Sequence, residues 1–287
     1  MREQITSNPI AASLASPDTR TCLADLERLA PKIGMAEVRL DLMHTFDIEK
    51  LVAASPVPLI MTCRPKRERG NYDGPEPGRL AILRRALECQ CAYIDVEAGS
   101  LDAVSGWRGS PTQIIASQHW FDRMPRDLGK TYLDLRDRCD VVKLAGMAES
   151  ATDVLPLLGF MRDATTPVIG MAMGELGTCT RILSPTFRHS LLTYGSASTL
   201  AATASGQVTV DELADTYKLQ LVNAATKVHV HITSTDNQFR AVLAVQERVA
   251  GGTELHVSLR TELCCDTAAL ADSVRRTLPG AEVEVAA

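Results

Sequence analysis

The feature that most constrains the fold is a regular alternation of short apolar segments with helical ones between residues 10 and 225. Eight segments of four to six residues have the apolar composition of buried strands. They are Ile10–Leu14, Ala36–Asp41, Leu59–Cys63, Ala92–Val96, Gln113–Ser117, Val141–Leu144, Val168–Met171 and Ser190–Tyr194. Most of them are continuously apolar rather than alternating, which is typical of parallel strands that are covered on both faces.

The segments between these strands have the spacing of amphipathic helices. Predicted helices over Arg79–Leu87 and Ser150–Met161 place their leucines on one stripe, and another opens with the capping box Thr209-x-x-Glu212 and runs to Leu221. Eight such strand–helix units predict an α/β protein that folds as a (β/α)8 TIM barrel. A doubly wound open sheet is the alternative, which we do not favour because no glycine-rich dinucleotide loop follows the first strand.

After Ala225 the sequence changes its pattern, and we expect a β-α-β-α-β arrangement. Its predicted elements are a strand over Val228–Ile232, a helix over Asp236–Ala250, a strand over Glu254–Leu259, a helix over Thr267–Leu278 and a strand over Ala281–Val285. We therefore expect two domains, a barrel over residues 1–226 and a small C-terminal α+β appendage over residues 227–287. The appendage could bind an effector, support a homodimer or cover barrel surface, and its sequence does not choose among these roles.

Composition excludes several classes of function. The 30 basic and 35 acidic residues give a net charge of −5, without the basic face that binding to nucleic acid needs. No apolar run reaches the roughly 18 residues of a membrane-spanning helix, and the N-terminal segment lacks the pattern of a signal peptide. The eight cysteines lack the spacing of a zinc site. We expect a cytoplasmic protein with reduced thiols.

His229 and His231 lie on the same face of a predicted strand and could pair as metal ligands. The sequence shows no third ligand, so we expect exposed polar alternation there rather than a metal site.

The chemistry of a TIM barrel sits at the carboxyl ends of its strands. Lys143 lies at one of them between apolar residues, where burial would lower the pKa of its ammonium group and free the amine to attack a carbonyl. His119, at the end of the preceding strand, could transfer protons. Taken singly, a lysine that reaches solvent and a hydrogen-bonded core histidine are the alternatives, but the two together favour imine chemistry.

Three arginines lie near other strand ends, at positions 39, 64 and 181. A guanidinium grips a carboxylate with two hydrogen bonds, so these residues suit a small anionic, hydroxylated substrate. Ordinary salt bridges to Glu37, Asp41 or Glu175 are the alternative.

Six motifs in order along residues 8 to 225 resemble those of a known family, the type I 3-dehydroquinate dehydratases. The motifs are EVRLD, TCRPKRE, SQHWF, DVVKLAG, MAMGELGTCTR and ATASGQ. The resemblance implies a shikimate-pathway lyase that converts 3-dehydroquinate to 3-dehydroshikimate and water through a lysine imine, without a cofactor. Another lysine-imine lyase, such as a class I aldolase, and a catalytically silent barrel that binds a pathway metabolite and signals through the appendage are the rival interpretations.

The resemblance also implies residue roles. Lys143 would form the imine, His119 would be the general acid and base, and Glu68 would orient the histidine. Substrate-binding positions by the same resemblance are Glu37, Arg39, Arg64, Arg181, Thr203, Gln207, Met171 and Met173. Among them Arg181 would hold the substrate carboxylate, and the two methionines have simple core filling as an alternative.

Three positions depart from the family pattern. Arg69 follows Glu68 where glycine is usual, Trp120 follows His119 where an acidic residue is common, and Ser205 stands where proline is usual. These departures bear on rate and substrate preference rather than on the type of reaction.

Overall fold

The computed structural model describes residues 8–197, 207–233, 243–249, 252–260 and 267–285. Its larger part is a parallel eight-stranded sheet in the order β7-β6-β5-β4-β3-β2-β1-β8. The strands are β1 (Ile10–Leu14), β2 (Met35–Arg39), β3 (Leu59–Thr62), β4 (Tyr93–Glu97), β5 (Gln113–Trp120), β6 (Val141–Met147), β7 (Val168–Met173) and β8 (Thr193–Ser196). Backbone pairing of Leu191 with Val168 brings β8 beside β7 and nearly closes the sheet into a barrel.

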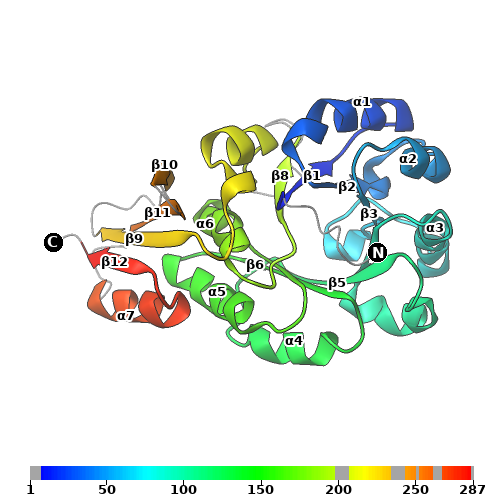
Figure 1. Cartoon of the computed structure of the whole chain (residues 1–287). Helices are drawn as coiled ribbons and strands as arrows, with labels where there is room; N and C mark the ends of the chain where they lie inside the picture. The colour runs from blue at the N-terminus through cyan, green and yellow to red at the C-terminus, as the bar shows by residue number, and fades with distance from the viewer. Residues whose placement is uncertain (1–7, 198–206, 234–242, 250–251, 261–266, 286–287) are drawn as a thin grey trace.

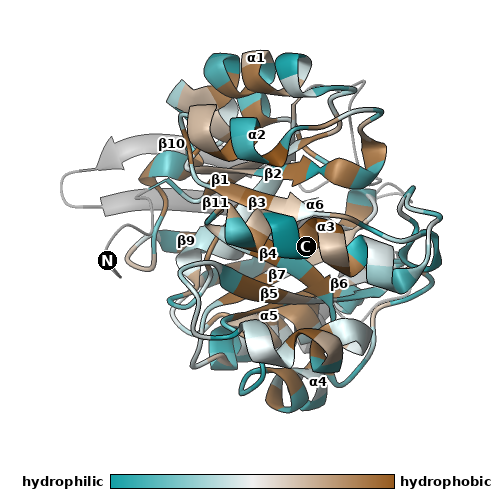
Figure 2. Ribbon diagram, turned by 90° about the vertical axis from the view of Figure 1, so that its right-hand side faces the viewer, coloured by the Kyte–Doolittle hydropathy of each residue, from teal (hydrophilic) through white to brown (hydrophobic). Residues whose placement is uncertain are grey.

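Helices surround this barrel (Figure 1). They are α1 (Thr19–Leu29), α2 (Ile48–Ala54), α3 (Glu76–Glu88), α4 (Leu128–Leu135), α5 (Val154–Asp163) and α6 (Thr178–Leu183). Between β4 and β5 the connection is the 3₁₀ segment Ala98–Trp107 instead. Figure 2 shows apolar strands at the centre and hydrophilic outer faces on the helices, as expected when each helix buries one stripe against the sheet. The predicted (β/α)8 barrel is confirmed.

Several predicted strand boundaries were wrong by a few residues. The fifth, sixth and seventh strands run to Trp120, Met147 and Met173, two or three residues beyond their predicted ends. The second strand ends at Arg39, because Leu40–Leu42 turns into a 3₁₀ segment. The eighth strand begins at Thr193, three residues later than the predicted Ser190. Here the apolar composition located the strand, but turns at its ends decided where pairing starts.

The capping box before the last predicted barrel helix is present, but the helix is shorter than predicted. The amide of Glu212 donates to Thr209 Oγ1 over 3.1 Å, and the amide of Thr209 donates to the Glu212 carboxylate over 2.9 Å. The helical turn then covers only Glu212–Thr216, because Lys218 adopts a left-handed conformation with φ of 48°. A continuous helix to Leu221 was therefore a wrong prediction.

The interior of the barrel changes from apolar to polar along each strand. Alternate residues of a strand point to the same side, so inward positions are two residues apart. Read along β2, β4 and β6, these positions are Met35 then Glu37, Tyr93 then Asp95, and Val141 then Lys143. The first residue of each pair belongs to a buried apolar cluster, and the second faces the carboxyl end of the barrel. This arrangement places buried charges on top of an apolar plug.

The C-terminal segment forms a separate four-stranded sheet in the order β10-β11-β9-β12 (Figure 1). Its elements are β9 (Lys227–Thr233), β10 (Leu243–Val249), β11 (Gly252–Arg260), α7 (Thr267–Thr277) and β12 (Glu282–Val285). The small α+β appendage is thus present, and α7 packs near α5, where Arg162 Nη1 donates to the carbonyl of Arg276 over 2.5 Å. Whether residues 1–226 and 227–287 are independent domains stays a prediction.

One element of the appendage was predicted wrongly. The helix expected over Asp236–Ala250 is a strand over Leu243–Val249, paired antiparallel with β11, and residues 236–242 lie outside the described part of the chain. Pairing in the sheet overrides the helical spacing of these residues, as strand formation depends on neighbouring strands more than on local preference. In the ranges that the structure describes, no helix has the length and apolar character that crossing a membrane requires.

Candidate active site

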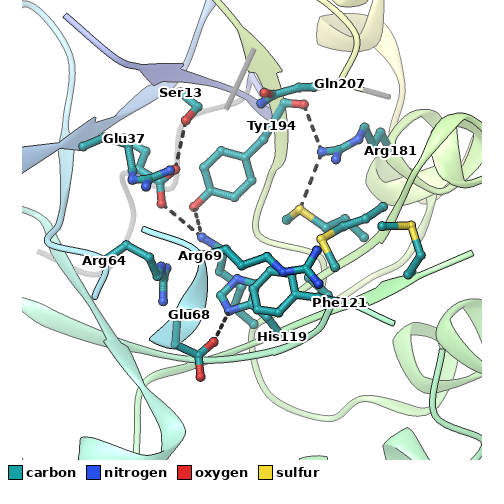
Figure 3. A pocket seen from close by; sticks show the side chains of 16 residues that line it. Ser13, Glu37, Arg64, Glu68, Arg69, His119, Phe121, Arg181, Tyr194 and Gln207 are labelled. Atoms are coloured by element: carbon teal, nitrogen blue, oxygen red, sulfur yellow. Dashed lines mark hydrogen bonds and ion pairs between the residues drawn. The ribbon is translucent and has the colours of Figure 1, made fainter. Parts of the chain in front are cut away.

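A cavity of about 280 Å³ opens at the carboxyl ends of the barrel strands. Figure 3 shows how side chains from many strands and loops point into it. Of the predicted site residues, the cavity is lined by Glu37, Arg39, Arg64, Glu68, His119, Lys143, Met171, Met173, Arg181 and Gln207. Thr203 lies outside the described residues, as does Ser205. The structure therefore brings together every predicted site residue that it describes.

Lys143 stands at the centre of this site, on β6, and only 4% of it is exposed. Its ammonium donates to Glu37 Oε1 over 3.0 Å, to Asp95 Oδ2 over 2.8 Å and to the Tyr194 hydroxyl over 3.3 Å. An ammonium has three N–H donors, so all three are used. The same nitrogen lies 4.4 Å from the centre of the Tyr194 ring. Lys143 is thus held in one position by three different strands.

The predicted direction of the Lys143 pKa was wrong. Burial alone would lower this pKa, but the carboxylates of Asp95 and Glu37 outweigh burial and raise it above its ordinary value. In the ligand-free protein the lysine is therefore an ammonium, and it must pass on a proton before it can act as a nucleophile. The sequence could not show this, because the two carboxylates come from strands far away along the chain.

Asp95 is the most important residue that the sequence analysis missed. It is fully buried on β4 and accepts hydrogen bonds from Lys143, from Arg64 Nη2 over 2.8 Å and from Ser117 Oγ over 2.6 Å. The positive charges of Arg64 and Lys143 hold the pKa of Asp95 far below its usual range, although burial opposes them. A charged residue inside the apolar segment YIDVE was the signal in the sequence, of the same kind as Lys143 inside DVVKLAG.

Replacing Asp95 by asparagine is expected to lower the free energy of unfolding by about 3–5 kcal/mol, since it leaves two buried cations without their shared anion. Urea unfolding followed by circular dichroism measures the change. Asp102→Asn is the matched control, because Asp102 pairs with Arg138 over 2.6 Å but is almost fully exposed. The control should shift stability by less than about 1 kcal/mol. Equal stability of both variants would contradict this account of the buried network.

Two of the predicted arginines are already paired. Arg39 donates to both oxygens of Asp41, over 2.9 and 2.7 Å. Arg64 is buried and donates to Asp95 and to Glu97 over 2.8 Å each. Both side chains line the cavity, but their charges are balanced by protein carboxylates. The alternative interpretation of ordinary salt bridges therefore describes the ligand-free state of these two residues.

Arg181 is different. It is 1% exposed on α6, and its Nε and Nη2 have no hydrogen-bond partner among the described residues. Its Nη1 lies 3.5 Å from the sulfur of Met171 and 3.5 Å from the carbonyl oxygen of Tyr194, which are weak contacts. Burial lowers the pKa of Arg181 to about 10. A buried guanidinium that faces a cavity with unused donors is suited to bind an anion there.

His119 lies near the end of β5 with its Nδ1 3.3 Å from Glu68 Oε2 (Figure 3). Burial lowers its pKa to about 4, helped by the positive charges of Arg64 and Lys143 and opposed by Glu68. At neutral pH the imidazole is therefore uncharged and can accept a proton. Glu68 thus lies against one edge of the ring.

The fold and the cavity together define a class of protein: a TIM-barrel enzyme in which a buried amine and a buried guanidinium line one cavity. A model of the family described as type I 3-dehydroquinase matches residues 10–224. The chain belongs to this family, and the resemblance seen in its motifs is confirmed. The appendage after residue 224 lies outside the matched part.

Individual relatives agree with this assignment. The bifunctional 3-dehydroquinate dehydratase/shikimate dehydrogenase of Arabidopsis thaliana is 32% identical over 206 residues, 68% of this chain and 34% of that longer protein. The 3-dehydroquinate dehydratase of Desulfotalea psychrophila is 31% identical over 218 residues, 72% of this chain and 96% of that protein. The crystal structure of 3-dehydroquinate dehydratase from Geobacillus kaustophilus has a TM-score of 0.61 at 26% identity, covering 72% of this chain and 89% of that one.

Proposed function

We propose that this chain converts 3-dehydroquinate to 3-dehydroshikimate and water through an imine on Lys143. The observation that carries the proposal is that one cavity holds both a buried lysine and the guanidinium of Arg181, whose Nε and Nη2 have no hydrogen-bond partner among the described residues. The lysine suits the ketone of such a substrate, and the arginine suits its carboxylate. Family membership and the named relatives support the same substrate.

The reaction begins when Lys143 gives up a proton to neutral His119 and its amine adds to the substrate ketone. His119 returns this proton to the hydroxyl group of the adduct, and loss of that hydroxyl as water forms an iminium ion. Neutral His119 then takes a proton from the carbon beside the iminium carbon, and the electron pair moves toward the nitrogen. The hydroxyl group one carbon further leaves with a proton returned by His119, which forms the second water. Hydrolysis of the product imine consumes one water and restores the lysine, so one water is released overall.

Each side chain around these steps has a proposed task. Glu37 and Asp95 hold the lysine nitrogen, and Glu68 holds the histidine. Arg181 holds the substrate carboxylate and so places the ketone at Lys143. Arg39, Arg64, Met171, Met173 and Gln207 shape the cavity, and Thr203 would contribute from the segment outside the described residues.

The pH dependence tests this proposal with the wild-type protein. Formation of the conjugated enone is followed by ultraviolet absorbance after 3-dehydroquinate is added. We expect kcat/KM to be nearly constant from about pH 6 to pH 8 and to fall toward pH 4, because His119 is the free base above its pKa of about 4. Absence of enone at every pH would refute the dehydratase proposal and leave the silent-barrel interpretation.

The pH dependence of folding stability should also reflect the titration of His119. The pKa of His119 is lower in the folded protein than the unperturbed value of about 6.5. The unfolded chain therefore binds more protons between these values, and stability falls as pH drops from about 6.5 to about 4. In His119→Asn this part of the pH dependence should disappear.

We also propose a cytoplasmic location and a homodimer. Cysteines 22, 63, 89, 91, 139 and 179 are free thiols, and burial raises the pKa of most of them, which fits a reducing compartment. The outer strands β10 and β12 of the appendage sheet have no further strand beside them in the described residues, and such edges can pair between copies. Cell fractionation tests the location. Light scattering of the full chain, compared with residues 1–226, tests the dimer and the domain division.

A further inference from the structure

The turn after β3 has an unusual conformation at Arg69. This residue is left-handed, with φ of 54°, directly after Glu68. The turn is tight, because a Cβ on Gly70 would lie only 2.1 Å from the carbonyl oxygen of Arg64. A side chain at a left-handed position is strained, and glycine is usual there in the motif that this sequence resembles. The strain at Arg69 must therefore be offset by contacts of its side chain.

The side chain of Arg69 forms the outer layer of a stack (Figure 3). Its guanidinium carbon lies 4.5 Å from the centre of the Phe121 ring. The Phe121 ring lies 5.7 Å from the His119 ring, and the two planes differ by only 10°. Arg69 is 59% exposed and His119 is 12% exposed, so the stack runs from solvent to the buried imidazole.

The other contact of Arg69 does not explain its position. Its Nη2 lies 3.4 Å from Asp122, whose side chain is 96% exposed. An ion pair so exposed to water contributes little to stability. The close approach to Phe121 is therefore the contact that places the guanidinium at the mouth of the cavity.

Charged groups surround His119 on its other sides. Glu68 contacts its Nδ1 and favours the protonated ring, as does Asp95 from β4, whereas Arg64 and Lys143 disfavour it. Arg69 lies on the solvent side of Phe121, opposite these buried groups.

We propose that Arg69 is a positioning residue: through Phe121 it covers the face of His119 and keeps water and protons away from the base of the reaction. This inference rests on the proposed function for its catalytic meaning, but the cover itself exists without substrate. Glu68 and Arg69 then hold the same ring, one by its edge and the other through its face.

Titration of His119 by NMR tests the cover directly. The His119 signal is assigned by its loss in His119→Asn, and its pKa is measured in the wild type and in Arg69→Gly. Glycine accepts the left-handed backbone, so the melting temperature should stay the same or rise. We expect the pKa of His119 to rise by about one pH unit, toward its unperturbed value, because both water and the loss of a cation favour protonation.

Arg67→Ala is the matched control. Arg67 lies in the same turn and is similarly exposed, but its guanidinium pairs with Glu76 instead of stacking. Removing its charge should leave the titration of His119 as in the wild type. A His119 pKa that is unchanged in Arg69→Gly, or one that rises equally in Arg67→Ala, would overturn the proposal.

Kinetics separate this inference from the proposed function. In Arg69→Gly the acid limb of kcat/KM should move upward with the His119 pKa, while kcat at pH 8 stays within about threefold of the wild type. An unmoved acid limb in a variant whose His119 pKa has risen would overturn the role of the cover in the reaction. A wild-type protein without dehydratase activity would refute the proposed function, and the NMR titration would still decide whether Arg69 covers His119.

Discussion

Replacing Lys143 by methionine is expected to reduce dehydration of 3-dehydroquinate by roughly 10⁴-fold or more, since the variant keeps the side-chain length but lacks the amine. Borohydride reduces an imine to a stable amine. Wild-type protein treated with substrate and borohydride should therefore lose activity and gain the mass of one adduct, and Lys143→Met should gain none. Mass spectrometry of the intact protein and of its peptides measures both results.

The matched control for this experiment is Lys130→Met, because Lys130 is an exposed lysine on α4, outside the cavity. Its activity and adduct should equal those of the wild type. An adduct on Lys143→Met would show that another amine forms the imine. An active enzyme without any adduct would refute the imine mechanism and leave the dehydratase activity standing.

Loss of the Lys143 charge should also change stability with pH. The ammonium of Lys143 helps to lower the pKa values of Glu37 and Asp95 in the folded protein, although burial opposes it. A carboxylate with a lowered folded pKa stabilises the protein above its unfolded pKa and loses this contribution as pH falls. The variant should therefore be destabilised at neutral pH and depend less on pH in the acid range than the wild type.

Replacing Arg181 by methionine is expected to lower kcat/KM for 3-dehydroquinate and to raise the free energy of unfolding. The guanidinium is the one that we assign to the substrate carboxylate, so kcat/KM should fall by about 10²-fold or more. In the ligand-free protein the same group is a buried charge without a carboxylate partner in the described residues. An apolar side chain of similar volume should therefore raise the free energy of unfolding by about 1–3 kcal/mol.

Thermal unfolding with and without a carboxylate ligand checks both parts of this prediction. The wild type should gain melting temperature when ligand is added, and Arg181→Met should start higher and gain little. Arg188→Met is the control, because Arg188 is exposed and lines another part of the surface. A variant that is both less stable and fully active would show that Arg181 serves the fold rather than the substrate.

The sequence predicted the barrel well because burial on both faces gives its strands a composition that needs no knowledge of their partners. It also located Lys143, His119 and Arg181, since polar residues stand out at the ends of apolar segments. It missed Asp95, which carries the same signal in the middle of a strand, where no motif directed attention to it. It gave the wrong direction for the Lys143 pKa because that direction depends on carboxylates from β2 and β4.

The same limit explains the error in the appendage. The spacing of residues over Leu243–Val249 fits a helix as well as a strand. The strand is selected by β11, which follows only two residues later in the sequence and supplies the hydrogen-bond partners of this segment. Pairing of this kind is a property of the assembled sheet rather than of the segment.

The change from apolar to polar residues inside the barrel means that neighbouring inward positions of one strand serve different purposes. A substitution at Met35 or Val141 alters the packed apolar plug and changes the stability of the whole barrel. A substitution two residues further, at Glu37 or Lys143, alters the reactive layer above an intact plug. The upper layer can therefore be changed while the lower layer keeps the barrel folded, provided that each new buried charge has a counter-charge.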